Sequence, residues 1–177
     1  VSGDGLVWTF HIRDNVKWHD NIPLTADDVE FTMSAILNPG SKSVYKKNVE
    51  NVTTFAAVDR SNFRIVLKKP DSFTAEKMTF PVIAKHYYTG ENILASPRNQ
   101  KPMGTGPYKF ISYKEKSLIT LNVNDIWWNL KASGKNNVNP PYISEVDVKI
   151  YEKGSDALSA FQVRDVDVVP VVIGDYN

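Results

Sequence analysis

The sequence contains no cysteine, and this absence excludes a disulfide-stabilised scaffold, a thiol nucleophile and a thiolate metal site. It also carries almost no net charge, because 21 Lys and Arg side chains are balanced by 20 Asp and Glu side chains. No field of one sign therefore attracts a polyanion, and we expect no nucleic acid partner. No apolar run approaches the ~20 residues that a membrane-spanning helix requires, and the chain contains neither internal repeats nor low-complexity tracts.

What the sequence does contain is typical of a globular protein. The 177 residues are 42% hydrophobic and 11% aromatic, which is enough for one sizeable core or somewhat more than one domain. Predicted strands and helices are mixed along the chain and do not alternate regularly. This order predicts the α+β class, with a mixed, mainly antiparallel sheet and a few flanking helices.

The most informative segment runs from Val7 to Phe31. Apolar and polar side chains alternate over residues 8–13, which predicts a half-buried strand. Asn21 lies in a turn, where asparagine accepts a positive φ. Thr25 followed three residues later by Asp28 predicts a helix N-terminus with a carboxylate variant of the capping box. The helix is expected to bury a stripe of four apolar side chains, namely Val29, Met33, Ile36 and Leu37, and to stop at Asn38-Pro39-Gly40.

Further along the chain, apolar periodicity and turn residues predict the remaining elements. They are short strands at 16–18, 52–58, 63–67, 108–113, 118–123, 143–151 and 166–173, a helix at 72–80, and a helix capped by Ser155 that ends near Arg164. The segment Gly104-Thr105-Gly106-Pro107 is the clearest chain-breaking signal in the sequence. Its two glycines and its proline predict a fixed, unusual backbone path. The polar stretch 91–100 predicts a boundary between two units, residues 1–100 and 101–177.

Three ordered motifs are similar to those of family 5 of the bacterial extracellular solute-binding proteins, the peptide- and nickel-binding receptors of ABC importers. The first comprises Ile12-Arg13, Lys17-Trp18-His19-Asp20 and Pro23-Leu24-Thr25-Ala26-Asp27-Asp28-Val29. The second comprises Gly104-Thr105-Gly106-Pro107-Tyr108-Lys109-Phe110 and Asn124-Asp125-Ile126-Trp127-Trp128. The third comprises Ile143-Ser144-Glu145-Val146, Ala157-Leu158 and Val166-Asp167. The sequence departs from the family pattern at Asn21 and at Arg164, where glycines are usual, and at Ile126, where tyrosine is common.

The resemblance implies a fold of the periplasmic-binding-protein type II, with two lobes hinged around a ligand cleft. It implies that residues 1–100 form the small accessory domain of the family and that residues 101–177 re-enter the first lobe. We therefore expect this chain to be a fragment of a longer parent, in which the second lobe supplies much of the ligand cradle. The apolar run from Val166 to Gly174 favours the same view, because an unpaired strand edge invites aggregation.

The function implied by the resemblance is that of the substrate-binding component of an ABC importer. Such a component captures oligopeptides or dipeptides outside the membrane and delivers them to the permease, from the periplasm or as a lipoprotein at the cell surface. Its partners are the peptide and the permease, and it needs no cofactor and no catalytic residue. The residues expected nearest the ligand are Val169, Pro170 and Val171, through shape and main-chain hydrogen bonds. The alternative is an interaction or structural module that contacts the permease or another partner and binds no ligand.

Other patterns in the sequence favour structural roles over chemistry. His11, His19 and Asp20 do not have a spacing that brings three metal ligands together, so no metal site is predicted. The acidic residues Asp27, Asp28 and Glu30 are explained by the positive end of a helix dipole. Two further features are expected to be structural or solvated: the Trp127-Trp128 pair, and the basic pairs Lys46-Lys47 and Lys68-Lys69.

Overall fold

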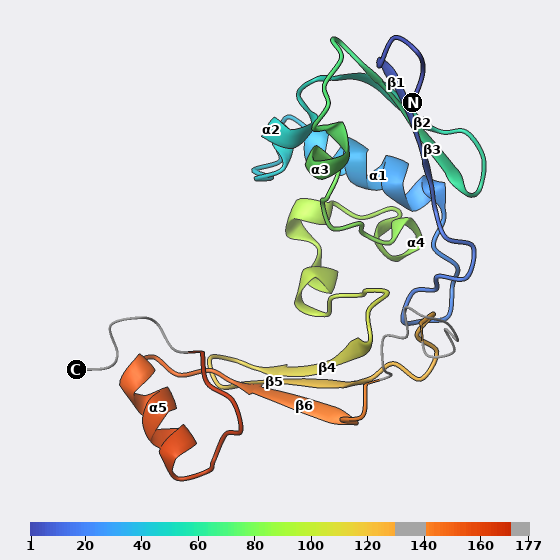
Figure 1. Ribbon diagram of the computed structural model, residues 1–177. Coiled ribbons are helices and arrows are strands. Elements are labelled where there is room, and N and C mark those ends of the chain that lie inside the picture. The colour runs from blue at the N-terminus through green and yellow to red at the C-terminus, as the bar shows by residue number, and fades with distance from the viewer. Residues whose placement is uncertain (130–140, 171–177) are drawn as a thin grey trace. The chain divides into compact units, whose positions relative to one another are not determined.

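The computed structural model describes residues 1–129 and 141–170, and it confirms the α+β class (Figure 1). The chain forms two compact units. The first contains Val1–Pro107 and the described part of Asn124–Pro140, and the second contains Tyr108–Val123 and the described part of Pro141–Asn177. Within the described ranges, no helix combines the length and the apolar character needed to cross a bilayer.

The first unit is built on a three-stranded antiparallel sheet. Its strands are β1 (Val7–His11), β2 (Val52–Ala57) and β3 (Asn62–Leu67), in the order β1-β3-β2. The register places Trp8 beside Ile65 and Phe10 beside Phe63, so that apolar side chains of neighbouring strands share one face. The predicted strands at 8–12, 52–58 and 63–67 are therefore confirmed to within a residue or two.

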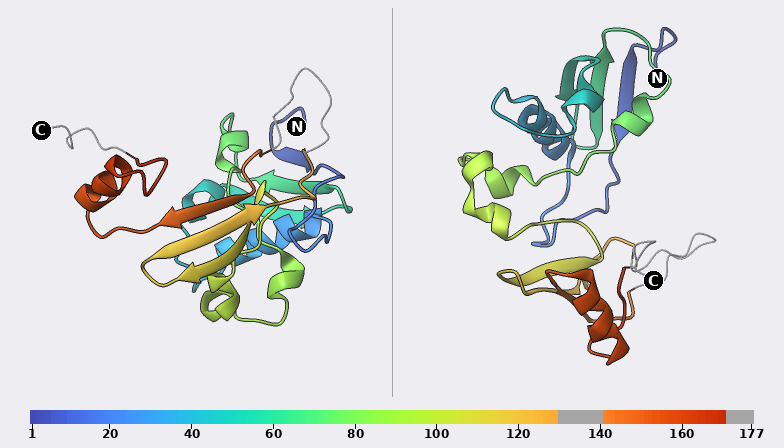
Figure 2. Two further views of the ribbon diagram at one scale, coloured as in Figure 1. Left: turned by 90° about the horizontal axis from the view of Figure 1, so that it is seen from below. Right: turned by 90° about the vertical axis from the view of Figure 1, so that its left-hand side faces the viewer.

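Helix α1 (Ala26–Leu37) covers the apolar face of this sheet, packing against β2 and β3 (Figure 2). The predicted helix is confirmed, and so is its end before Asn38. Of the predicted stripe, Leu37 is 38% exposed and lies outside the core. The core of the unit joins helix, sheet and loop residues, namely Ala26, Val29, Met33, Ile36, Val49, Phe63, Ile65, Leu67 and Phe80.

Short helices complete the first unit. They are α2 (Lys46–Val49), α3 (Thr74–Lys77), α4 (Lys85–Tyr88), and the 3₁₀ turns η1 (Ile93–Ala95) and η2 (Pro97–Gln100). The predicted helix at 72–80 is too long, because only a single turn forms at Thr74–Lys77. The predicted strand at 16–18 is reduced to an isolated bridge between Lys17 and Pro23. No neighbouring strand among the described residues pairs with the rest of this segment.

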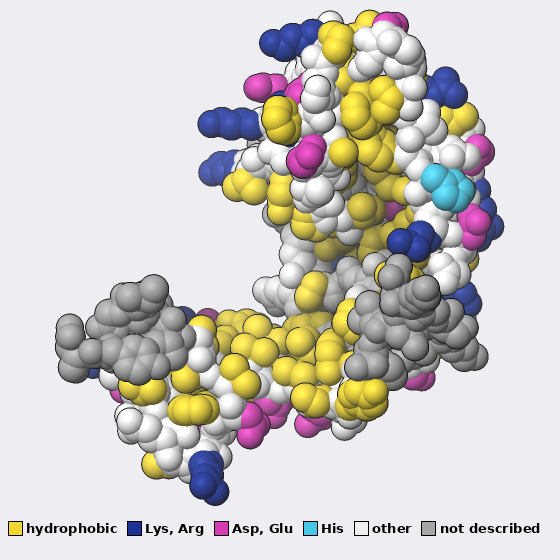
Figure 3. All heavy atoms as spheres, viewed as in Figure 1, with side chains coloured by type: hydrophobic (Ala, Val, Ile, Leu, Met, Phe, Trp, Pro, Cys, Tyr) yellow, Lys and Arg dark blue, Asp and Glu magenta, His cyan; other side chains and the backbone are white. Residues whose placement is uncertain are grey.

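The second unit contains another three-stranded antiparallel sheet. Its strands β4 (Tyr108–Lys114), β5 (Leu118–Val123) and β6 (Glu145–Lys149) follow one another in sequence order. The register aligns Phe110, Leu121 and Val146 across the three strands, and a bulge between Phe110 and Ser112 keeps Tyr113 in line with Ile119 and Val148. One face of the sheet is therefore apolar, and Figure 3 shows hydrophobic side chains gathered over these strands.

The last helix of the described chain is α5 (Gly154–Gln162). The predicted cap was wrong, because Lys153 and not Ser155 occupies the N-cap position. The predicted strand at 166–173 is also wrong for its described part: residues 166–170 form no strand, since no neighbouring strand hydrogen-bonds to them. The remainder of that predicted strand lies outside the described residues.

Helix α5 ends with a left-handed residue that is not glycine. Arg164 has a φ of 62°, its amide donates to the Phe161 carbonyl, and the Asp165 amide donates to the Ala160 carbonyl at 2.8 Å. This is the helix-ending geometry that glycine adopts without a steric penalty. The same tolerance appears at Asn21, whose φ of 73° confirms the predicted turn.

We expect Arg164→Gly to raise the free energy of unfolding by about 0.5–1 kcal/mol, because it removes the Cβ strain of the left-handed residue. Urea unfolding of the two proteins measures this difference. Gln162→Gly, placed inside the same helix, is the control and is expected to destabilise it. A loss of stability in Arg164→Gly would contradict the strain assigned to this position.

Candidate ligand-binding site

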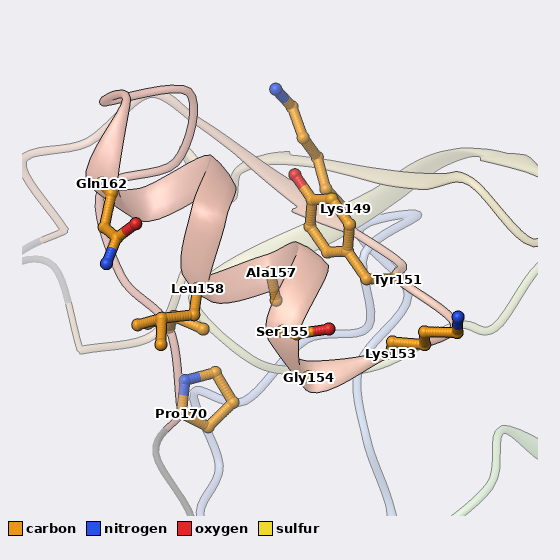
Figure 4. Close-up of a pocket in the computed structure, with 10 residues that line it drawn as sticks. Lys149, Tyr151, Lys153, Gly154, Ser155, Ala157, Leu158, Gln162 and Pro170 are labelled. Carbon is orange, nitrogen blue, oxygen red and sulfur yellow. The ribbon is translucent and has the colours of Figure 1, made fainter. Parts of the chain in front are cut away.

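Two hollows of the second unit lie beside helix α5. One cavity of about 560 Å³ is bordered by the end of β6, by α5 and by Val169 and Pro170 (Figure 4). A second cavity of about 690 Å³ adjoins it and shares five lining residues with it, namely Lys149, Tyr151, Ala157, Val169 and Pro170. Both volumes fall in the range that small-molecule sites occupy.

The apolar part of the lining comes from α5 and from the segment that follows it. Ala157 and Leu158 lie on one side of α5, and Val169 and Pro170 are brought back to them by the turn at Arg164. Figure 4 shows Leu158 and Pro170 on the same border of the cavity. These side chains provide contact area and shape, and they carry no reactive group.

An ion pair borders the second cavity, which both of its residues line. Lys149 Nζ donates to Asp165 Oδ1 at 2.6 Å, and the Tyr151 hydroxyl donates to Asp165 Oδ2 at 3.4 Å. The hydrogen bond from Lys149, reinforced by its positive charge, lowers the pKa of the Asp165 carboxyl below its ordinary value of 3.8. The same hydrogen bond raises the pKa of the Lys149 ammonium above its ordinary 10.5.

These shifts define the pH range of the pair. The lowered pKa of the Asp165 carboxyl contributes stability above pH 3.8, and this stability is lost as the pH falls through the pKa of the folded state. The raised pKa of the Lys149 ammonium contributes stability below pH 10.5, and this stability is lost as the pH rises through the pKa of the folded state. We therefore expect Asp165 to titrate below 3.8 by carbon-detected NMR, and Lys149→Met to move its pKa back toward 3.8. Lys153→Met is the matched control. An Asp165 pKa that does not respond to Lys149→Met would show that the ion pair does not cause the shift.

The structure places two of the three predicted ligand residues in this lining. Val169 is half-buried, Pro170 is exposed, and both border the two cavities. Val171 lies outside the described residues. Because residues 166–170 pair with no described strand, their main-chain N–H and C=O groups take no part in β-sheet hydrogen bonding. Their role toward a ligand stays a prediction.

The histidines predicted to be surface residues have structural partners. His11 Nδ1 lies 3.3 Å from Asn62 Oδ1. His19 Nδ1 accepts a hydrogen bond from the Gly104 amide at 3.3 Å, and its Nε2 lies 3.2 Å from the Gly106 carbonyl. Among the described residues, no group of three or more His, Asp or Glu side chains is placed to hold a metal ion.

His19 therefore joins the first motif to the second. A Cβ atom on Gly104 would approach His19 Cε1 to 3.2 Å, so a larger residue there would press on the imidazole ring. Neither Gly104 nor Gly106 has a positive φ. The fully buried Asn124 completes this junction, donating from Nδ2 to the Gly106 carbonyl at 2.9 Å and from its amide to the Pro107 carbonyl at 2.8 Å. This role of His19 was not predicted, although both motifs are evident in the sequence.

Asp28, considered above as part of an acidic cluster, is a buried structural acceptor. Its side chain accepts hydrogen bonds from the Thr25 amide at 2.9 Å, the Lys85 amide at 2.8 Å and Trp18 Nε1 at 3.3 Å. Three donors satisfy the carboxylate, which is the arrangement that a buried charge requires. The predicted helix cap is thus present, and it also ties α1 to the Trp18 turn and to α4.

The tryptophan pair packs within the first unit. The rings of Trp127 and Trp128 meet edge to face with their centroids 5.9 Å apart, and the Arg13 guanidinium lies 5.1 Å from the Trp128 ring centroid. Asn15 Nδ2 also donates to the Trp128 carbonyl at 3.4 Å. These contacts anchor the end of the second motif to the first.

Comparisons with known proteins give a consistent set of relatives. The chain matches the family described as bacterial extracellular solute-binding proteins, family 5 Middle, over residues 1–176. It is 28% identical to the oligopeptide-binding protein AppA of Bacillus subtilis (strain 168), over 98% of this chain and 31% of that protein. It is also 28% identical to the dipeptide-binding protein of Escherichia coli (strain K12), over 96% of this chain and 34% of that protein.

Solved structures show the same likeness. NikZ from Campylobacter jejuni in complex with Ni(L-His) superposes with a TM-score of 0.82 at 28% identity, over 94% of this chain and 32% of that one. AppA from B. subtilis in complex with a nonapeptide gives a TM-score of 0.78 at 26% identity, over 93% and 32%. The chain spans about a third of the length of these relatives.

Proposed function

Because the chain belongs to family 5 of the bacterial extracellular solute-binding proteins, we propose that it forms part of the substrate-binding component of an ABC importer for oligopeptides or dipeptides. The observation that carries this proposal is the family match over residues 1–176, together with curated relatives that are named as peptide-binding proteins. The type II periplasmic-binding-protein fold expected from the sequence is confirmed by the structural likenesses.

The cavity beside α5 supports a binding role without chemistry. The two adjoining cavities together combine apolar side chains with the Lys149–Asp165 ion pair, which is a composition suited to holding a ligand by contact and orientation. Val169, Pro170 and Val171 are the residues that we propose to lie nearest the ligand. No catalytic residue and no cofactor is part of the proposal.

The location and organisation follow from the same family. We place the protein outside the cytoplasmic membrane, in the periplasm or at the cell surface as a lipoprotein, where it hands its peptide to the permease. We assign residues 1–100 to the accessory domain and residues 101–177 to the first lobe. The closing of two lobes on the ligand then produces the form that docks on the permease.

Thermal unfolding of the whole gene product with pools of di-, tri- and longer peptides tests this function. A ligand that binds only the folded state at 100 times its Kd stabilises it by about 2.7 kcal/mol. We expect such stabilisation by at least one pool, and little with the 177-residue chain alone. Tight peptide binding by these residues alone would contradict the proposed place of the ligand cradle.

The alternative is an interaction module that contacts the permease or a partner and holds no peptide. It predicts no stabilisation by any pool, together with binding of the gene product to the purified permease. The same experiment therefore separates the two functions.

A further inference from the structure

Two basic pairs that were predicted to be solvated lie close together on the first unit, namely Lys46-Lys47 and Lys68-Lys69. Lys68 Nζ donates to the Glu50 carbonyl at 2.7 Å, directly after helix α2, and Asn51 Nδ2 donates to the Lys69 carbonyl at 2.9 Å. Pairs that lie some twenty residues apart in the sequence therefore share one surface. We define the lysine surface by five residues on the segments 38–51 and 68–77: Lys42, Lys46, Lys47, Lys68 and Lys69.

This surface concentrates positive charge in a protein that is nearly neutral. Segments 38–51 and 68–77 together contain six lysines and three acidic residues, whereas the whole chain has a formal charge of +1. One of those acids, Asp71, is already paired with Lys77 at 2.6 Å. Figure 3 shows Lys and Arg side chains projecting from the edge of this unit that carries α2. Lys42, Lys47, Lys68 and Lys69 are exposed, and with six lysines against three acids the two segments present an excess of positive charge to solvent.

Two exposed apolar side chains lie on the same segments. Val44 is 80% exposed between Lys42 and Lys46, and Phe73 is 67% exposed at the start of α3. Asn48 Nδ2 donates to the Lys77 carbonyl at 3.2 Å, so that the segment carrying Val44 and the one carrying Phe73 are joined. Apolar side chains beside basic ones would add buried apolar area to the electrostatic attraction of an anionic lipid surface.

We propose that the lysine surface docks on an anionic phospholipid bilayer. Charge complementarity supports this partner, since each lysine near an anionic leaflet contributes to binding and several act together. A protein partner is less well matched, because protein interfaces are depleted in lysine and enriched in arginine, and neither segment contains an arginine.

Co-sedimentation of the 177-residue chain with vesicles tests the proposal. We expect binding to vesicles of equal parts phosphatidylglycerol and phosphatidylcholine, and none to phosphatidylcholine alone. Binding is expected to weaken steeply as ionic strength rises from about 0.01 M to about 0.15 M, since the screening length shortens. The peptide ligand proposed above plays no part in this experiment, so the failure of one proposal leaves the other standing.

The decisive variant is Lys47→Glu/Lys69→Glu, which reverses the charge of one exposed lysine in each basic pair. We expect its vesicle affinity to fall by about tenfold or more. Lys114→Glu/Lys116→Glu, at the exposed end of β4 and in the turn that follows it, makes the same change in net charge and is expected to leave the affinity within about twofold of the unchanged chain. Equal losses in both variants, or no binding to the anionic vesicles, would overturn the proposal. So would salt-sensitive capture of the purified permease by this surface in place of lipid.

Discussion

Replacing Asp28 with alanine is expected to lower the free energy of unfolding by about 3–5 kcal/mol, because a buried donor that loses its acceptor costs about 1–3 kcal/mol. The substitution orphans three donors at once: the amides of Thr25 and Lys85, and the indole of Trp18. Asp28 is only 4% exposed and Trp18 only 1%, so water does not readily replace the carboxylate. Since domains of this size are stable by about 5–15 kcal/mol, the loss is a large share of the total.

Urea unfolding followed by far-ultraviolet circular dichroism measures this effect. Asp27→Ala is the matched control, because its side chain is 57% exposed and its pair with Lys85 lies on the surface. We expect that control to change stability by no more than about 0.5 kcal/mol. If Asp28→Ala were as mild as Asp27→Ala, the three hydrogen bonds could not be the link between α1, the Trp18 turn and α4.

The second large effect is expected on ligand binding. Val169→Asp is expected to weaken peptide binding by the whole gene product about 30-fold or more, since burying a charge against an apolar ligand surface costs about 2 kcal/mol or more. The side chain lies in the lining shared by both cavities, and Leu158 of α5 lines the first of them. A competition assay with a fluorescent peptide measures the change in Kd.

Val163→Asp provides the matched control for this substitution. Val163 follows α5 directly, is 76% exposed and borders neither cavity, so the added charge stays in water. We expect the control to bind peptide as the unchanged protein does. Equal Kd values for Val169→Asp and the unchanged protein would remove the cavity beside α5 from the binding site.

Local patterns were sufficient to predict much of the fold. The strand periodicity at residues 8–13, the cap at Thr25 and the stop at Asn38 all describe neighbours in the sequence, and the structure has a strand, a helix start and a helix end at these places. The order β1-β3-β2 was not predicted. It depends on pairing between residues more than fifty positions apart, and periodicity carries no information about such a partner.

Contacts between residues far apart in the sequence were also missed at the candidate site and around it. The cap formed by Asp28 was predicted, but the hydrogen bond from the Lys85 amide, 57 residues away, was not. His19 was read as a turn residue because its partners Gly104 and Gly106 lie in another motif. The strand expected at 166–173 is absent from its described part, residues 166–170, for the opposite reason. Its residues favour a strand, but a strand needs a hydrogen-bonding neighbour, and the described chain offers none.

We propose that this chain belongs to a protein that binds peptides and does not transform them. Isothermal titration calorimetry of the whole gene product with a single defined peptide tests this function most directly. We expect saturable binding of one peptide per chain, a negative heat-capacity change from buried apolar surface, and recovery of the peptide intact after dissociation. A folded gene product that gives no binding heat with peptides of any length, or that returns the peptide cleaved, would contradict it.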